Sequence, residues 1–313
     1  MRSDVKMDSS VQKASLAMPK QNLTKILAET IKTGIIKSNL IAVFAGLALA
    51  LYINNMSPFD KLAEILLTIA GSALVIGAAG TFNNLYDRDI DSVMDRTKKR
   101  PTVTGAIQPK LALLLGSVMS LFGLLFLAIA SPLAAFFGFL GLFLYVVPYT
   151  MWSKRRTVYN TEIGSLSGAM PPLIGWAAIT SDLMHLELLG LFIIMVLWQM
   201  PHFYAIAIRK HNDYKAANVP MLPVVKGFKR TYAQTNIYLA ALMAGSFLFA
   251  GLHIGIALLA FLLSSAWFIL SVIGYKKMSP EKWATTMFIF SLNHLTILFV
   301  VIIVYCFIGT LFA

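Results

Sequence analysis

Long apolar stretches recur along almost the whole chain, and this pattern leaves few soluble folds open to it. A membrane-spanning helix needs about 20 predominantly apolar residues. Nine stretches of that kind occur, at residues 35–53, 62–85, 111–130, 133–151, 160–180, 186–207, 232–252, 254–274 and 286–311. The chain is 58% hydrophobic and 13% charged, with a mean hydropathy of +0.74, more than a soluble domain of this size can bury. The sequence therefore predicts an all-α, polytopic membrane protein built as a nine-transmembrane-helix bundle.

The distribution of basic residues predicts the orientation of this bundle. Nine spans place successive loops on alternate sides of the membrane. In that arrangement only one of the 26 lysines and arginines, Lys61, falls on one side, and all the others fall on the opposite side. Loops rich in Lys and Arg stay in the cytoplasm. We therefore expect the N-terminus inside and the C-terminus outside. The net charge of +12 belongs to these loops, and no nucleic acid partner is expected.

The chain is expected to comprise a tail and a single domain. Residues 1–34 are polar, with scattered acids, and lack the apolar core of a signal peptide, so they are predicted to be a cytoplasmic N-terminal tail. Residues 35–313 form the transmembrane domain. The only cysteine, Cys306, lies inside the last span, which excludes a disulfide and predicts a small residue of the core.

The most densely charged stretch, residues 82–101, follows the second apolar span directly. If the helix continues into it, four side chains share one face, namely Asn83, Asp87, Asp91 and Asp95. Asp89 lies opposite, and Pro101 is expected to end the helix. Carboxylates one turn apart repel each other and require bound cations. A wet juxtamembrane loop of mixed charge is the alternative, but the four-residue spacing favours a site for Mg²⁺, a hard ion that prefers oxygen ligands.

Basic residues near this stretch suit the phosphates of a substrate. Four of them follow the acids directly, at Arg96, Lys98, Lys99 and Arg100. Residues 154–156, Lys-Arg-Arg, follow the fourth span. They either serve only as a positive-inside signal or lean over the acidic stretch to hold a phosphate.

A second polar cluster follows the sixth span. Four side chains fall on one helical face, at Trp198, His202, Arg209 and Asp213. A membrane histidine is either a hydrogen-bonded packing residue or a ligand, and both interpretations stay open for His202 and for His294 of the ninth span. Both charged clusters leave the membrane on the same side. We therefore expect them to face each other across one cavity, polar at its mouth and apolar below, which matches a ligand with a diphosphate head and a long hydrocarbon tail.

These residues carry a family resemblance. Residues 83–91, followed by residues 96–101, resemble the first Asp-rich motif of the UbiA-type intramembrane prenyltransferases. Asn84, where quinone-type relatives carry Asp, and the stretch 198–203 are most similar to the haem-farnesylating members. Residues 213–214 and 219–225 also match. The similarity covers nearly the whole membrane region and leaves out roughly the first 30 residues.

The resemblance implies a magnesium-dependent enzyme. It would transfer the farnesyl group of farnesyl diphosphate to the 2-vinyl group of haem b with addition of water, giving haem O and diphosphate, in haem O and haem A biosynthesis for terminal oxidases. By position, the metal ligands would be Asn83, Asp87, Asp91 and Asp213. The catalytic residues would be Asp87, Asp91, Asp213 and Arg96. Substrate-binding residues would be Asn83, Asn84, Lys98, Arg100, Trp198, His202, Arg209, Lys154 and Arg155.

The second motif departs from the family pattern, which usually has two or more Asp, because here Asp213 is flanked by Asn212 and Lys215. Two alternatives therefore stay open: a site with one magnesium ion, and a site with a second ion held with the help of Asn212. The implied location is the plasma membrane of a bacterium, with active-site loops facing the cytoplasm. Beyond the substrates and the lipid bilayer, haem A synthase or terminal oxidase assembly proteins are further candidate partners.

Three other functions compete with this one. The nearest is a prenyltransferase of the same superfamily that acts on an aromatic or quinone precursor. The second is an ion-coupled membrane transporter, because kinked helices and buried polar groups also describe such carriers. Against it, the polar residues cluster at one membrane face, and no inverted repeat is found. The third, a scaffold for oxidase assembly, is compatible with the enzyme.

Overall fold

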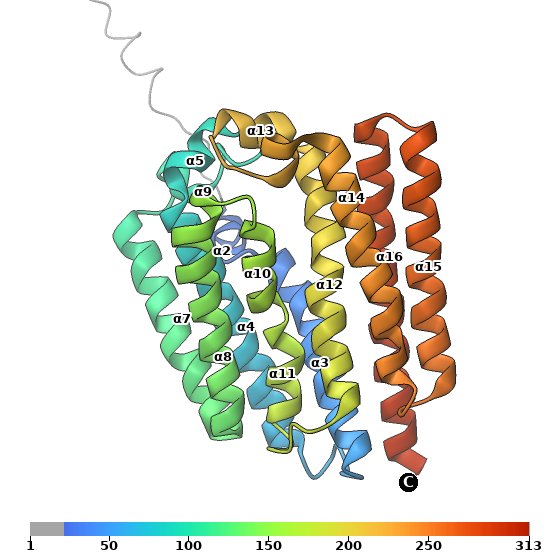
Figure 1. Cartoon of the computed structure of the whole chain (residues 1–313). Coiled ribbons are helices and arrows are strands. Elements are labelled where there is room, and N and C mark those ends of the chain that lie inside the picture. The colour runs from blue at the N-terminus through green and yellow to red at the C-terminus, as the bar shows by residue number, and fades with distance from the viewer. Residues whose placement is uncertain (1–21, 313) are drawn as a thin grey trace, which may run out of the picture.

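The computed structural model describes residues 22–312, and every regular element in that range is a helix (Figure 1). The long helices run side by side and form one bundle. They are α3 (Thr33–Ile53), α4 (Leu62–Tyr86), α7 (Pro109–Ala130), α8 (Pro132–Leu144), α12 (Leu186–Arg209), α14 (Leu222–Gly245), α15 (Ile254–Lys277) and α16 (Pro280–Phe312). In Figure 1, α2 (Leu23–Thr30) and the last turn of α16 lie toward opposite ends of the bundle.

Seven stretches within the described range are long and apolar enough to cross a membrane. One of them joins three elements, because α8 continues through the π-helix η1 (Tyr145–Ser153) into α9 (Lys154–Arg156). The other two predicted spans take a different form. Residues 160–180 contain two short helices, α10 (Asn160–Gly168) and α11 (Met170–Ala177). Residues 232–252 contain the end of α14 and the 3-10 helix η2 (Ser246–Phe249).

The interruption between α10 and α11 has a local cause. Pro171 and Pro172 occupy the first turn of α11, where a residue without an N–H donor is tolerated. Prolines at these positions would remove hydrogen bonds from the interior of one continuous helix, so the chain starts a new helix instead.

Helices α3 and α11 pack at very short range. A Cβ added to Gly46 would overlap the carbonyl oxygen of Pro172, and a Cβ added to Gly175 would overlap the carbonyl oxygen of Val43. Small residues let membrane helices approach backbone to backbone. These two glycines therefore fix the spacing of the two helices.

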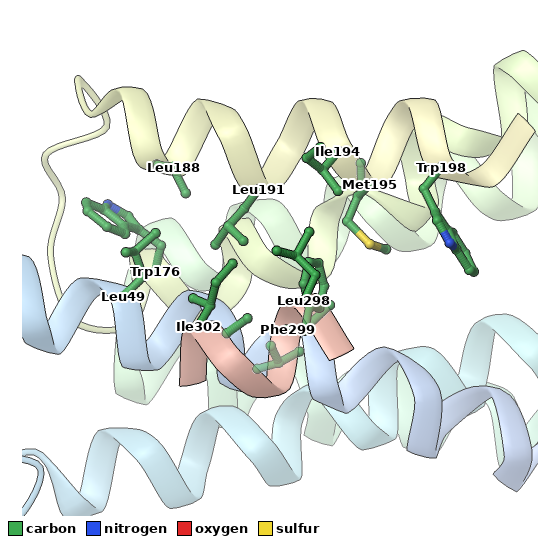
Figure 2. Packing of buried hydrophobic residues seen from close by; sticks show 14 of the residues in the cluster. Leu49, Trp176, Leu188, Leu191, Ile194, Met195, Trp198, Leu298, Phe299 and Ile302 are labelled. Carbon is green, nitrogen blue, oxygen red and sulfur yellow. The ribbon is translucent and has the colours of Figure 1, made fainter. Parts of the chain in front are cut away.

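The apolar core lies where α3, α11, α12 and α16 meet (Figure 2). Leu49, Trp176, Leu191 and Phe299 come from these four helices and are completely buried. The buried position of Cys306 in α16 confirms the sequence expectation.

Three local predictions need correction. Helix α5 (Arg88–Val93) ends before Asp95, which is therefore not on the face shared by the earlier acids and is exposed. Pro101 begins the short helix α6 (Pro101–Thr104) instead of ending a helix, because its missing N–H suits a first turn. Asp213 lies on a separate helix, α13 (His211–Ala216), so the face that begins at Trp198 is interrupted at Lys210.

Of the predicted tail, residues 1–34, the first 21 residues lie outside the described range. From Leu23 to Thr30 the chain forms α2, and Asn84 of α4 donates hydrogen bonds to two of its carbonyls, those of Thr30 (2.9 Å) and Glu29 (3.2 Å). The folded part therefore begins before residue 35.

Candidate active site

The acidic stretch lies at the end of the bundle where α2, α5 and α13 gather (Figure 1). Asn83 belongs to the last turn of α4, Asp87 joins α4 to α5, and Asp91 lies in α5. The backbone N–H of Asp87 donates to the carbonyl of Asn83 (2.9 Å), and that of Asp91 donates to the carbonyl of Asp87 (2.8 Å). The four-residue spacing therefore holds through Asp91, and these side chains are 3%, 0% and 1% exposed.

Asp87 is surrounded by donors. Asn83 Nδ2 donates to Asp87 Oδ2 over 2.8 Å, and the ammonium of Lys154 forms an ion pair with the same oxygen. Arg155 approaches Asp87 Oδ1 at 3.5 Å. A buried carboxylate is stable only when it is paired and hydrogen-bonded, and Asp87 meets that condition. Lys154 and Arg155 thus lean over the acidic stretch, which is the second of the two interpretations of residues 154–156.

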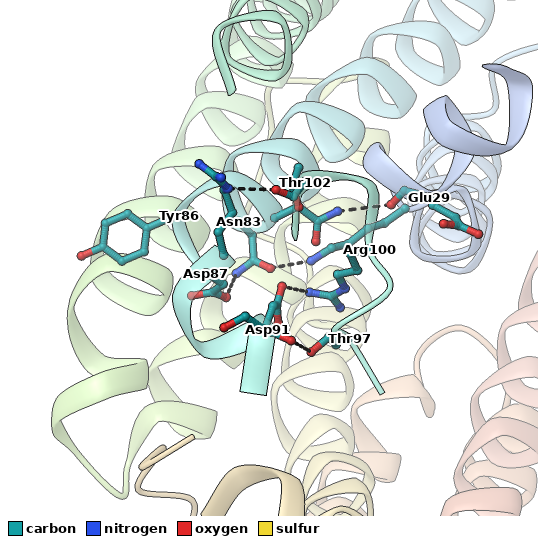
Figure 3. Close-up of polar contacts among 12 residues, drawn as sticks. Glu29, Asn83, Tyr86, Asp87, Asp91, Thr97, Arg100 and Thr102 are labelled. Atoms are coloured by element: carbon teal, nitrogen blue, oxygen red, sulfur yellow. Dashed lines mark hydrogen bonds and ion pairs between the residues drawn. The ribbon is translucent and has the colours of Figure 1, made fainter. Parts of the chain in front are cut away.

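Asp91 is paired from the other side. Arg100 reaches back from the loop after α5 and donates to Asp91 Oδ2 at 2.5 Å, while Thr97 Oγ1 donates to the carbonyl of Asp91 at 3.0 Å (Figure 3). These contacts fold residues 94–100 over α5. Of the other loop cations, Lys98 pairs with Asp95 at 2.6 Å, and Arg96 is exposed.

Lys32, at the junction of α2 and α3, is a site residue that sequence reasoning missed. Its Nζ donates to Asn83 Oδ1 at 2.5 Å. Burial, together with the nearby charges of Arg100 and Lys154, holds the pKa of Lys32 well below its ordinary value. The site thus concentrates positive charge that an arriving anion would stabilise. Lys32 and Asn83 are 51 positions apart in the sequence, so no local sequence pattern indicates this contact.

Asp89 lies on the opposite side of α5 and has a different partner. Arg155 donates to both of its carboxylate oxygens, at 2.6 and 2.7 Å, and its guanidinium lies 4.8 Å from the centre of the Tyr86 ring. The hydrogen bonds from Arg155 lower the pKa of Asp89 to about 2. Asp89 is therefore ionised at physiological pH and helps to hold Arg155 beside Asp87.

The second polar cluster divides between two places. The backbone N–H of Asp95 donates to Asp213 Oδ1 at 3.1 Å, which places α13 against the loop after α5. Buried apolar side chains of α5, α12 and the segments after α5 and α13 form one cluster, made of Ile90, Met94, Ala207, Ala217, Val219 and Met221. The two charged regions are therefore neighbours at one end of the bundle.

Trp198, His202 and Arg209 share a face of α12, as expected, but this face contacts α16. The rings of Trp198 and His202 stack at 4.6 Å. Trp198 Nε1 donates to the carbonyl of Ser291 at 2.8 Å, and His202 Nδ1 is hydrogen-bonded to Ser291 Oγ at 2.7 Å. The Arg209 guanidinium lies 4.6 Å from the centre of the Phe288 ring. None of these contacts links the three residues directly to Asp87.

The arrangement of a helical bundle with buried acids at one end agrees with the sequence comparisons. The profile of the UbiA prenyltransferase family matches residues 39–309. The chain belongs to this family. A protoheme IX farnesyltransferase of Shouchella clausii (strain KSM-K16) is 66% identical over 307 residues, which is 98% of this chain and 99% of that protein.

Solved structures share the UbiA fold. A digeranylgeranylglyceryl phosphate synthase, 18% identical, superposes with a TM-score of 0.71 over 91% of this chain and 98% of that one. A UbiA homolog from Archaeoglobus fulgidus bound to DMAPP and Mg²⁺, 17% identical, gives a TM-score of 0.66 over 91% and 98% of the two chains. The UbiA chain described here is thus a multi-pass, all-helical membrane protein.

A metal in this UbiA site would need ligands beyond the protein. Residues 22–312 contain no group of three or more His, Cys, Asp or Glu side chains that could hold an ion. Mg²⁺, however, usually takes one or two carboxylates and completes its shell with water and substrate phosphates. Asp87, Asp91 and the amide oxygen of Asn83 supply buried oxygen ligands of that kind. The donor set fits magnesium bound together with a diphosphate.

Two further polar groups lie deeper in the bundle. His294 Nε2 is hydrogen-bonded to Ser264 Oγ at 3.0 Å, which satisfies one side of its buried ring by packing contacts. Glu162 of α10, which sequence reasoning did not assign to the site, accepts hydrogen bonds from Tyr204 (2.5 Å) and Gln234 (2.7 Å). In the sequence, the only indication that Glu162 is part of a polar network was its place at the start of a predicted span.

Proposed function

We propose that this UbiA-family chain transfers the farnesyl group of farnesyl diphosphate to the 2-vinyl group of haem b, with addition of water, giving haem O and diphosphate. The observation that carries the proposal is the 66% identity to a protoheme IX farnesyltransferase over 98% of the chain. The geometry around Asp87 and Asp91 supplies the physical basis. We propose that the diphosphate binds at this end of the bundle.

The residues proposed to hold Mg²⁺ are Asn83, Asp87 and Asp91, with Asp213 contributing from α13. When bound, the ion neutralises charge on the diphosphate and makes it a better leaving group. Support comes from the donor set and from the Archaeoglobus fulgidus homolog, which is bound to DMAPP and Mg²⁺. Magnesium dependence stays a proposal for this chain.

The chain's own cations are proposed to stabilise the leaving group. Arg100 and Lys154 neutralise Asp91 and Asp87 in this structure, and Lys32 donates to the amide oxygen of Asn83. A diphosphate brings new negative charge to the same place, and these three side chains can then donate to its oxygens. Negative charge grows on the diphosphate as the bond to the allylic C1 carbon breaks, so preorganised donors lower the barrier. Arg96 and Lys98 would add positive charge at the mouth.

The apolar interior is proposed to direct the second half of the reaction. Excluding water from the allylic cation prevents its hydrolysis until the vinyl group attacks C1. The positive charge then lies on the porphyrin side chain, where water adds and loses a proton to leave a hydroxyl group. We assign Asn84, Arg155, Trp198, His202 and Arg209 to the walls that hold the two substrates.

We further propose nine membrane crossings, with α10 and α11 together forming the fifth and α14 with η2 the seventh. The N-terminus and the acidic end would face the cytoplasm of a bacterium. This proposal rests on the distribution of lysine and arginine along the chain. Haem A synthase and oxidase assembly proteins stay predicted partners.

One experiment tests the reaction. Purified protein is incubated with haem b, farnesyl diphosphate and Mg²⁺, and the porphyrin is analysed by mass spectrometry. The expected product has gained one farnesyl group and one hydroxyl group, and a matched sample with a metal chelator is expected to yield none. Unchanged haem b, with prenylation of an aromatic acceptor in the same preparation, would instead support the quinone-type alternative.

A further inference from the structure

A polar pocket of about 470 Å³ opens between the segment that leads into α10 and the first half of α14. Its lining residues are Val158, Tyr159, Leu222, Lys226, Arg230 and Gln234. The pocket is distinct from the contacts around Asp87, and nothing in the proposed reaction so far uses it.

Two unneutralised cations stand at this pocket. Lys226 and Arg230 are exposed, and neither forms an ion pair with a carboxylate in residues 22–312. Between them Gly227 has φ of 75°, a left-handed value that glycine adopts without strain, and α14 is kinked there. Both side chains line the same pocket across that kink.

On the inner side of the pocket, Gln234 belongs to a polar network that forms no ion pair with these two cations. Gln234 Nε2 donates to Glu162 Oε1 at 2.7 Å and to the hydroxyl of Tyr204 at 3.1 Å. Glu162, the nearest carboxylate in this network, also accepts from Tyr204 at 2.5 Å. These donors engage only Glu162 Oε1, and Oε2 is buried without a hydrogen-bond partner among the described residues. Neither oxygen forms an ion pair with Lys226 or Arg230 in residues 22–312, so both cations remain available for an external anion.

The pocket lies a short stretch of chain away from the diphosphate end. Tyr159 follows Lys154, which pairs with Asp87, by five residues, and five residues span at most about 18 Å. A tetrapyrrole that reaches the Asp87 site with one edge can therefore place its opposite edge near this pocket. In haem b the vinyl groups and the two propionates occupy opposite edges of the macrocycle.

We propose that Lys226 and Arg230 bind the propionate carboxylates of the haem acceptor and thereby turn its vinyl edge toward the diphosphate. This inference rests on the proposed function and extends it to the acceptor. Charge-assisted hydrogen bonds from Lys and Arg to carboxylates are among the strongest polar contacts in proteins. They would fix which edge of a nearly symmetric macrocycle faces C1.

The test compares haem b with its dimethyl ester, in which the propionate charges are removed. Lys226→Gln and Arg230→Gln are each expected to raise the KM for haem b roughly tenfold, the effect of losing one charge-assisted hydrogen bond. The KM for farnesyl diphosphate should stay unchanged. With the dimethyl ester, wild type and both variants should be equally poor. Lys229→Gln, an exposed cation of the same helix outside the pocket, is the matched control and should behave as wild type.

Other outcomes overturn the proposal. Equal losses with haem b and with its ester, or an unchanged KM for haem b in both variants, would show that the propionates are not bound here. A raised KM for farnesyl diphosphate would assign the two cations to the diphosphate. A defect that appears only in vesicles containing anionic phospholipid would assign them to a lipid headgroup.

Binding alone separates this proposal from the proposed function. Haem b and its ester are titrated into the protein without farnesyl diphosphate and followed by absorbance. If the turnover assays with farnesyl diphosphate and Mg²⁺ yield no haem O, the reaction assignment fails, and this titration still tests the propionate site. Tighter binding of haem b than of the ester, lost in Lys226→Gln and Arg230→Gln but kept in Lys229→Gln, would still support the propionate site, and its absence would refute that site.

Discussion

The carboxylate of Asp213 accepts a hydrogen bond from the backbone N–H of Asp95, over 3.1 Å and across 118 positions in the sequence. This bond ties helix α13 to the loop that covers α5. Met94, next to Asp95, is buried in one apolar cluster with Val219 and Met221. The two acidic regions of this UbiA-family chain are therefore parts of one end of the bundle, as a shared diphosphate site requires.

The buried acids should be essential for turnover. Asp87→Asn and Asp91→Asn each remove a charged oxygen ligand, and we expect haem O formation to fall by more than about 100-fold. Asp95→Asn is the matched control, because Asp95 is exposed and pairs only with Lys98 through its side chain. It should retain most activity. Near-normal turnover in either buried variant would contradict the assignment.

The ion pair between Lys154 and Asp87 should be worth more than a surface pair. Lys154→Met leaves a completely buried carboxylate without its closest cation, a change that typically costs about 3–5 kcal/mol. Adding Asp87→Asn removes the stranded charge, so the double variant should be more stable than Lys154→Met alone. The measurement is the free energy of unfolding in detergent. Strictly additive effects would mean that the two side chains do not interact.

The contact between α3 and α11 should not tolerate a single methyl group. Gly46→Ala or Gly175→Ala places a Cβ onto a backbone carbonyl oxygen of the facing helix, and overpacking of this kind costs about 1–3 kcal/mol. Gly34→Ala lies in α3 with nothing within 4 Å of the added Cβ, so it should be neutral or slightly stabilising. Thermal unfolding of the three variants checks this, and equal melting temperatures would exclude a tight interface.

His202 should contribute through its contacts with α16. Its Nδ1 is hydrogen-bonded to Ser291 and its ring stacks on Trp198. His202→Phe keeps the stacking but removes this hydrogen bond, while the Ser291 hydroxyl still donates to the carbonyl of Phe288 at 2.6 Å, so the expected loss is about 0.5–1.5 kcal/mol. The absorption spectrum of added haem b should be unchanged, because the histidine is engaged in packing. A shifted Soret band in His202→Phe would instead identify His202 as an iron ligand.

Much of the architecture could be predicted from the chain alone. Hydropathy is a local property, since a segment of about 20 apolar residues must find an apolar environment wherever it packs. This is why the helical, membrane-spanning character, the charged end after residue 82 and the buried position of Cys306 could be predicted. The four-residue spacing was also local, and it holds from Asn83 through Asp91.

What the tertiary structure alone decided is which groups meet. Lys32 contacts Asn83 and Lys154 contacts Asp87 across 51 and 67 positions, and no periodicity within one helix encodes such pairs. Tertiary packing likewise decides that α5 ends at Val93 and that Trp198 and His202 contact α16. These outcomes depend on how whole helices pack, because the cost of burying a charge or a polar ring is met by partners that only the assembled bundle supplies.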